Sequence, residues 1–119
     1  MSDPLLLQGI EEFNHGHFFE AHELWEAAWN DVVGEEKRFY QGLVQIAAGY
    51  HKLALAQYNG ARKLLERGSQ TLSGFLPDYA GVDLAPLLET AANTLHRLTA
   101  ARPQPDFPVP TVRLLSSLC

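Results

Sequence analysis

Apolar residues recur three or four positions apart along most of this chain, which is the spacing of one face of an α-helix. Leu6, Ile10 and Phe13 form the first such stripe. Pro4 suits the first position of a helix, because it lacks the backbone N–H that would be unpaired there. Gly16 suits the end of a helix, where a left-handed backbone is often needed. The pattern therefore predicts a first helix between these two residues.

Two longer periodic segments follow, over about residues 17–31 and 36–58. The apolar face of the first combines aromatic and small residues with one imidazole: Phe18, Ala21, His22, Trp25, Ala28 and Trp29. The second segment is apolar on two sides, with a main face of Phe39, Leu43, Ile46, Tyr50 and Leu53. A helix that is apolar on two sides packs against neighbours on both, so we expect this helix to be central.

Two further helices are predicted after residue 58. Asn59-Gly60 is typical of a hinge between antiparallel helices, with Asn59 as the cap of a fourth helix that ends by Gly74. Asp83 is placed to cap a fifth helix. Its apolar stripe consists of Leu84, Leu87, Leu88, Ala91, Leu95 and Leu98.

Beyond residue 102 the composition changes. Four prolines exclude a helix there and favour an extended Pro-rich tail over 103–119. We expect Phe107 and Val109 in a groove between helices, and residues 111–119 either in a short turn of helix or disordered. No segment alternates between apolar and polar residues as a strand does. The prediction is an all-α protein, a compact bundle of about five helices with antiparallel helical hairpins in one domain, 1–102, followed by the C-terminal tail.

Composition and charge exclude several classes of protein. With 119 residues the chain has room for one hydrophobic core. A net charge of −5 argues against nucleic-acid binding, and the densest basic run, Arg62-Lys63 with Arg67, is typical of the solvated side of a helix. No apolar run approaches the roughly 20 residues of a membrane span, and the first residues lack the order of a secretion signal. The single cysteine, Cys119, excludes an internal disulfide, and these features together indicate a cytoplasmic protein.

Residues 13–29 hold the densest chemistry of the chain, with both tryptophans, three of the five histidines and three carboxylates. His22 and Glu26 are four positions apart and are therefore neighbours on the helix surface. Glu20 and Glu23 lie on the same helix. The string His-Glu-x-x-Glu is similar to the zinc-protease helix motif with its second histidine replaced by a carboxylate. His22 and Glu26 are thus candidate ligands of a divalent metal, provided that other helices add one or two more.

The central helix supplies polar groups that could meet this pair. Gln41 and Gln45 are four positions apart, and His51 lies further along. Glutamine is a poor transition-metal ligand but a good donor to a buried carboxylate. Three interpretations of His22, Glu26 and their surroundings stay open: a buried structural network, a ligand or metal pocket, and a catalytic acid/base site. Burying such groups unpaired would cost several kcal/mol, which favours the network.

Two motifs in this region resemble those of a known family. The first is Phe13-Asn14-x-Gly16-x-Phe18-Phe19-Glu20-Ala21-His22-Glu23-x-Trp25-Glu26-x-x-Trp29. The second is Arg38-Phe39-x-Gln41-Gly42-Leu43-Val44-Gln45-x-Ala47-Ala48-x-x-His51, followed by Asn59-Gly60-Ala61 and Leu64-Leu65. Over about residues 10–75 the chain resembles the prokaryotic domain-of-unknown-function family 309, a family of small all-helical proteins. The resemblance implies a helical bundle and assigns no catalytic residue.

We expect a non-catalytic binding or interaction module, because no complete catalytic constellation, Gly-rich phosphate loop or serine elbow accompanies the fold signature. The sequence does not specify its ligand, and assembly into a homo-oligomer fits such a role. The alternative is a metal-dependent, hydrolase-like enzyme with His22 and Glu26 as ligands and Glu23 as acid/base. In a third interpretation the Pro-rich tail docks on a partner or on a neighbouring subunit.

Overall fold

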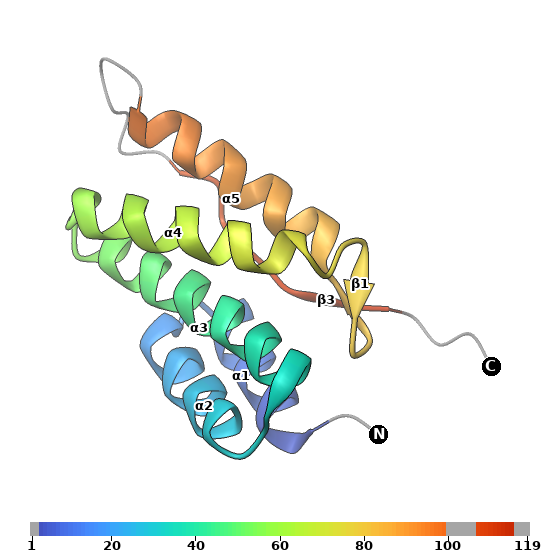
Figure 1. The fold of residues 1–119 in the computed structure, drawn as a ribbon. Helices are drawn as coiled ribbons and strands as arrows, with labels where there is room; N and C mark the ends of the chain where they lie inside the picture. The colour runs from blue at the N-terminus through green and yellow to red at the C-terminus, as the bar shows by residue number, and fades with distance from the viewer. Residues whose placement is uncertain (1–2, 100–106, 116–119) are drawn as a thin grey trace.

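The computed structural model of the chain describes residues 3–99 and 107–115. Within these residues the chain forms five α-helices and three strands of two residues each (Figure 1). The helices are α1 (Pro4–Asn14), α2 (Phe18–Asn30), α3 (Gly34–Ala54), α4 (Tyr58–Ser73) and α5 (Leu84–Thr99). The predicted all-α class with about five helices is confirmed. None of the helices in the described part of the chain is long and apolar enough to cross a membrane.

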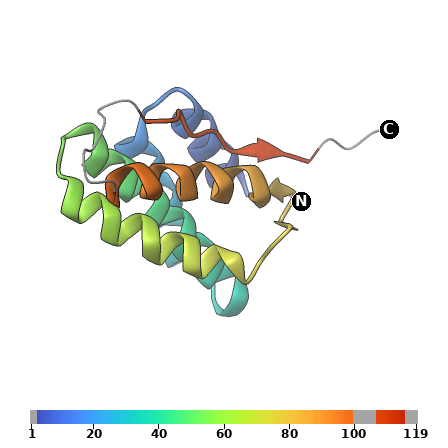
Figure 2. The same cartoon turned by 90° about the horizontal axis from the view of Figure 1, so that it is seen from above.

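α3 lies at the centre of the bundle. It contacts α2 on one side and α4 on the other, while α1 packs on α2 and α5 packs on α4. α2, α3 and α4 lie side by side in the layer nearest the viewer in Figure 1. Seen from above, α1 and the C-terminal segment lie on the opposite side of this layer (Figure 2). The prediction of a central third helix with neighbours on two sides is confirmed.

Aromatic residues of α1, α2 and α3 build the middle of the core. The buried Phe13 ring lies 5.5 Å from the Trp25 ring and 6.1 Å from the Tyr50 ring. The Trp25 indole N–H donates to the backbone carbonyl of Leu6 at 3.2 Å. The Tyr50 hydroxyl shares a 2.9 Å hydrogen bond with the hydroxyl of Thr94. Both buried polar groups therefore have partners, and their bonds link α2 to α1 and α3 to α5.

Glycines allow α3 and α4 to approach closely. A Cβ atom at Gly68 would lie 2.8 Å from Cγ1 of Ile46 and 3.0 Å from its backbone nitrogen. A Cβ atom at Gly49 would lie 2.8 Å from the Leu65 side chain. Contacts this short do not occur between ordinary side chains, so these positions require glycine for the observed spacing.

The turn between α3 and α4 differs from the prediction. α3 ends at Ala54, and Asn59 with Gly60 belongs to the first turn of α4, so the predicted hinge at these two residues is wrong. Ala56 takes the left-handed conformation instead, with φ of 58°. The backbone N–H of Gln57 donates to the carbonyl of Lys52, five residues back, which closes the helix end in the manner of a Schellman motif.

A small antiparallel sheet, which the sequence did not predict, joins the C-terminal segment to the link between α4 and α5. Its strands pair in the order β1 (Asp78–Tyr79), β2 (Val82–Asp83) and β3 (Arg113–Leu114). Ala80 and Gly81, both with positive φ, form the two-residue turn between β1 and β2. Strands of two residues leave no alternating pattern in the sequence. β3 also shows that the predicted turn of helix is wrong for residues 111–115, while 116–119 lie outside the described residues.

The described part of the tail packs against the helices. The Val112 backbone N–H donates to Oδ1 of Asn14 at 2.7 Å, and Nδ2 of Asn14 donates to the Val112 carbonyl at 2.9 Å. Val112 is buried, and Val109, although 80% exposed, lines the same hollow between the helices as Phe107, as predicted for both residues. Phe107 is half-buried and lines a hollow with residues of α3 and α4. Residues 103–106 lie outside the described ranges.

Candidate functional site

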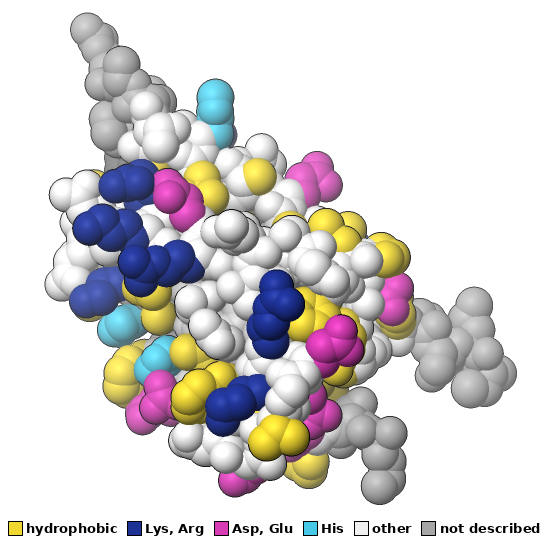
Figure 3. Space-filling model, in the orientation of Figure 1, with side chains coloured by type: hydrophobic (Ala, Val, Ile, Leu, Met, Phe, Trp, Pro, Cys, Tyr) yellow, Lys and Arg dark blue, Asp and Glu magenta, His cyan; other side chains and the backbone are white. Residues whose placement is uncertain are grey.

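α2 and α3 leave an open groove between their outer sides. It contains two hollows, of about 300 Å³ and about 280 Å³. The first is lined by Phe19, His22, Ala48, His51 and Lys52, and the second by Glu26, Trp29, Gln41, Val44 and Gln45. We call these ten residues the α2–α3 groove. Figure 3 shows this face of the molecule, where histidine side chains lie among hydrophobic ones between α2 and α3.

Helical spacing brings these side chains to the groove. Along each helix the lining residues are mostly three or four positions apart, which places them on one side of it. Five of the seven predicted site residues are thereby brought together: His22, Glu26, Gln41, Gln45 and His51. Glu20 and Glu23 are exposed on α2 and line neither hollow.

His22 joins the two hollows. Its Nε2 atom lies 3.5 Å from Oε2 of Glu26, and the two side chains are 26% and 54% exposed. Its Nδ1 atom is buried and has no hydrogen-bond partner among the described residues. The Phe19 ring is 6.1 Å from the His22 ring and 5.3 Å from the His51 ring. Phe19 thus lies between two imidazoles at the rim of the groove.

The predicted buried network of His, Glu and Gln is wrong. Glu26 and Gln41 are exposed, as are Glu20 and Glu23. The amide oxygen of Gln45 accepts a 3.2 Å hydrogen bond from the Thr71 hydroxyl of α4. Gln41 and Gln45 line a hollow with Glu26, and no hydrogen bond joins them to it among the described residues. Because Glu26 and Gln41 are exposed, their polar groups can be satisfied by water without partners from the facing helix.

Metal binding was the second interpretation of His22 and Glu26. In residues 3–99 and 107–115, no three His, Cys, Asp or Glu side chains gather closely enough to hold an ion. Zinc sites in proteins use three or four protein ligands. Among the residues described, the pair therefore lacks the additional ligands that this interpretation requires.

Sequence reasoning did not single out Phe19 or Lys37 as site residues. The Lys37 ammonium lies 3.8 Å from the centre of the Trp29 ring and donates to the Trp29 carbonyl at 3.0 Å. This cation–π contact fixes the indole at one end of the groove. Phe19 carried a usable signal, because it is an aromatic residue outside the apolar stripe of α2. Lys37 carried no such signal.

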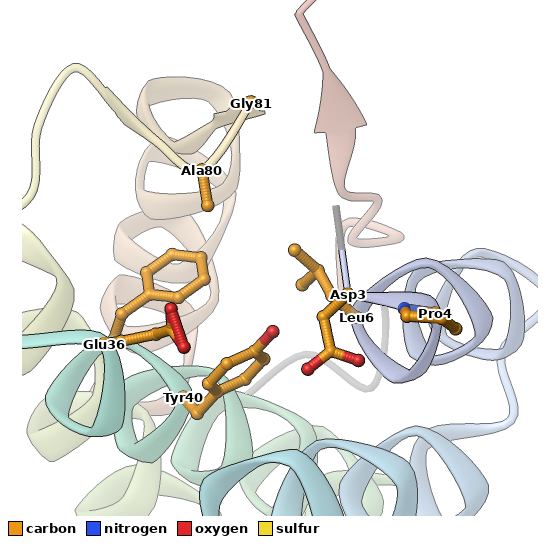
Figure 4. Close-up of a pocket in the computed structure, with 8 residues that line it drawn as sticks. Asp3, Pro4, Leu6, Glu36, Tyr40, Ala80 and Gly81 are labelled. Atoms are coloured by element: carbon orange, nitrogen blue, oxygen red, sulfur yellow. The ribbon is translucent and has the colours of Figure 1, made fainter. Parts of the chain in front are cut away.

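A separate hollow of about 560 Å³ lies where the starts of α1 and α3 meet the β1–β2 turn (Figure 4). The carboxylates of Asp3 and Glu36 and the hydroxyl of Tyr40 point into it. Burial, followed by the charges of the two acids, raises the pKa of Tyr40. Asp3 accepts from the Leu5 N–H at 2.8 Å as the N-cap of α1, and Glu36 lies in the first turn of α3. Helix N-termini favour acids, so capping of α1 accounts for Asp3 and the dipole of α3 accounts for Glu36 without a ligand.

Comparison with known proteins places the groove in a recognised family region. A family model described as a domain of unknown function (DUF309) matches residues 6–64. This range includes nearly all of α1, the whole of α2 and α3, and the start of α4, so both walls of the groove lie within it. No curated protein matches the chain. The chain belongs to the DUF309 family, a domain of unknown function, as its two helical motifs indicated.

Proposed function

We propose that this protein is a non-catalytic interaction module and that the α2–α3 groove is its contact surface for another protein. The exposure of Phe19 carries the proposal. Phe19 is 45% exposed, and its ring lies beside two imidazole rings, where it adds little to the core. Aromatic side chains are enriched in protein interfaces, because they bury a large area for little loss of conformational freedom.

The dimensions of the groove favour a protein partner over a small molecule. Small-molecule sites are typically clefts or cavities of about 300–1,000 Å³ that enclose most of the ligand surface. The two hollows here, of about 300 Å³ and about 280 Å³, lie at the small end of that range, are open to solvent and follow one another along two helices. The α2 wall runs from residue 19 to residue 29, which is about 15 Å at 1.5 Å per residue. An open groove of this length accommodates several side chains of a helix or an extended segment.

The lining has the chemistry of a protein interface. Val44 and Ala48 form a half-buried apolar floor between the two helices. Exposed polar groups surround it, including the Glu26 carboxylate and the Gln41 amide. An apolar centre with a polar rim excludes water from the contact and fixes the orientation of the partner.

The metal-dependent enzyme has one supporting observation, which is the unpartnered Nδ1 atom of His22. That enzyme would need at least one ligand beyond His22 and Glu26, and no described residue supplies it. The interaction module requires no additional group and is therefore the better supported function.

Site-specific photo-crosslinking in the native cells tests this proposal. Photoreactive benzoylphenylalanine at position 19 should give a discrete adduct with another polypeptide. The matched control is the same residue at position 76, because Leu76 is 47% exposed and lies outside the groove. Adducts at position 19 and none at position 76 would support the contact surface. If neither position, or both equally, gave adducts, the groove would not be a specific contact surface.

A further inference from the structure

We infer that the partner at this face is a second copy of the chain, in a dimer that sets α2 of each copy against α4 of the other. The inference rests on the proposed function, since it names the occupant of the same surface. Two observations support it: the distribution of charge over α2, α3 and α4, and the positions of the charged residues along the helix axes.

Charge is separated across the bundle. α1 and α2 together hold five glutamates and no lysine or arginine. α3 and α4 hold six of the nine Lys and Arg residues of the chain, against three glutamates. Figure 3 shows Lys and Arg side chains gathered over the beginning of α4. On the face formed by α2, α3 and α4, the α2 edge carries three glutamates and no lysine or arginine, so it is acidic. The α4 edge carries three Lys or Arg residues and one glutamate, so it is basic.

The two edges lie at the same height along the helices. Each neighbour of α3 runs antiparallel to it, so α2 and α4 run in the same direction (Figure 1). Ala48 of α3 lines a hollow with His22 of α2. The next residue, Gly49, lies against Leu65 of α4. The middle of α2 around His22 is therefore level with the part of α4 around Leu65.

A twofold axis parallel to α3 would bring these edges together. Twofold rotation about this axis places α2 of one copy opposite α4 of the other and leaves the position of each residue along the axis unchanged. The face is therefore complementary to itself. Glu23 of one copy then lies level with Arg67 of the other, and Glu26 and Lys63 each lie about one helical turn from that pair, on opposite sides of it. All four side chains are exposed. In the described part of the chain, Glu26 has an ion contact with His22, and the other three have none within 4.0 Å.

The centre of the face permits close approach. On the axis, α3 of one copy meets α3 of the other through the small side chain of Ala48. Lys52 also lies near the axis, and its ammonium already donates to Gln57 at 3.0 Å. Three helices side by side, about 10 Å apart and about 24 Å long, offer on the order of 700 Å². This area is close to the roughly 800 Å² that each partner of a standard interface buries.

Sedimentation velocity of the full-length chain tests the inference by charge reversal. The wild type should sediment as a dimer, with twice the chain mass of 13.2 kDa. Glu23→Lys/Glu26→Lys and Lys63→Glu/Arg67→Glu should each raise the dimer Kd at least tenfold, because the attraction between the acidic edge of one copy and the basic edge of the other becomes repulsion. Mixing the two variants should restore a heterodimer, since each then supplies the charge that the other lacks. Glu11→Lys/Glu89→Lys changes the net charge equally outside this face and should leave the wild-type Kd unchanged.

A monomeric wild type, a dimer that ignores both reversals, or a mixture that stays monomeric would each overturn the inference. These outcomes are separable from a failure of the proposed function. If the purified chain is monomeric and position 19 crosslinks to a polypeptide of another mass, the groove is a contact surface for a different protein. If position 19 gives no adduct, the groove itself is excluded.

Discussion

Single side chains in this protein divide into those that hold the core and those that face the groove. Tyr50 belongs to the first group, with 2% of its surface exposed and its hydroxyl bonded to Thr94. Burial raises the pKa of Tyr50 to about 12, and its hydrogen bond with the Thr94 hydroxyl opposes that shift. His22 belongs to the second group, because its ring is partly exposed and its closest ionic neighbour is the exposed Glu26. The raised pKa of Tyr50 gives the stability of the core a measurable dependence on pH.

Alkaline titration should reveal Tyr50. An unfolded tyrosine ionises near pH 10, about two pH units below the folded Tyr50. Its contribution to stability is therefore complete below pH 10 and is lost as the pH rises from 10 to about 12, with a slope of up to about 1.4 kcal/mol per pH unit. Urea unfolding at pH 8–12 should show a shallower decline for Tyr50→Phe than for the wild type. Tyr58→Phe, at an exposed tyrosine, is the control. Equal slopes for all three proteins would contradict this assignment.

At the scale of elements, the close contact between α3 and α4 sets the position of everything around it. Gly49 and Gly68 let the two helices approach, and Ile46 and Leu65 fill the space above them. The contact keeps the basic edge of α4 beside the outer side of α3. α2 packs on the other side of α3. The α3–α4 contact therefore also sets the distance between the α2–α3 groove and the basic edge of α4.

Gly68→Ala should destabilise the protein. The added Cβ would lie 2.8 Å from Ile46 Cγ1 and 3.0 Å from a backbone atom, so both helices must shift, at a cost of about 1–3 kcal/mol. Gly60→Ala is the matched control, because its Cβ would make an ordinary 3.6 Å contact with Lys52. That change should stabilise the helix by about 0.5–1 kcal/mol. Denaturant unfolding measures both, and equal effects would argue against close packing at Gly68.

Local periodicity predicted the helices well and the connections less well. α1 begins at Pro4 as predicted, and α2 differs from its predicted range by one residue at each end. The α3–α4 hinge could not be found from residue type, because Ala56 adopts a left-handed backbone that usually marks glycine or asparagine. The neighbouring helix ends hold it there through backbone hydrogen bonds. Strands of two residues are likewise held by their partners and leave no sequence pattern.

At the scale of the whole molecule, the positions of the site residues were predictable and their burial was not. Helical spacing placed His22 and Glu26 on the α3 side of α2, and Gln41 and Gln45 on the α2 side of α3, which the groove bears out. Whether a further element covers that groove depends on how the chain after residue 73 is routed. α5 and the C-terminal segment pack away from the groove. The groove is therefore an open surface, where a buried network was expected.

The free energy of unfolding of a groove variant separates a contact surface from a structural network. Phe19→Ala, Glu26→Ala and Gln41→Ala together remove three exposed groove side chains without touching the core. Since alanine is a good helix former, we expect the triple variant to match the wild type within about 1 kcal/mol in urea unfolding. Phe39→Ala, at a fully buried residue, should lose about 3–5 kcal/mol and serves as the reference. A loss of about 3 kcal/mol or more in the free energy of unfolding of the triple variant would show that these residues stabilise the fold. That result would contradict the proposal that the groove is a contact surface.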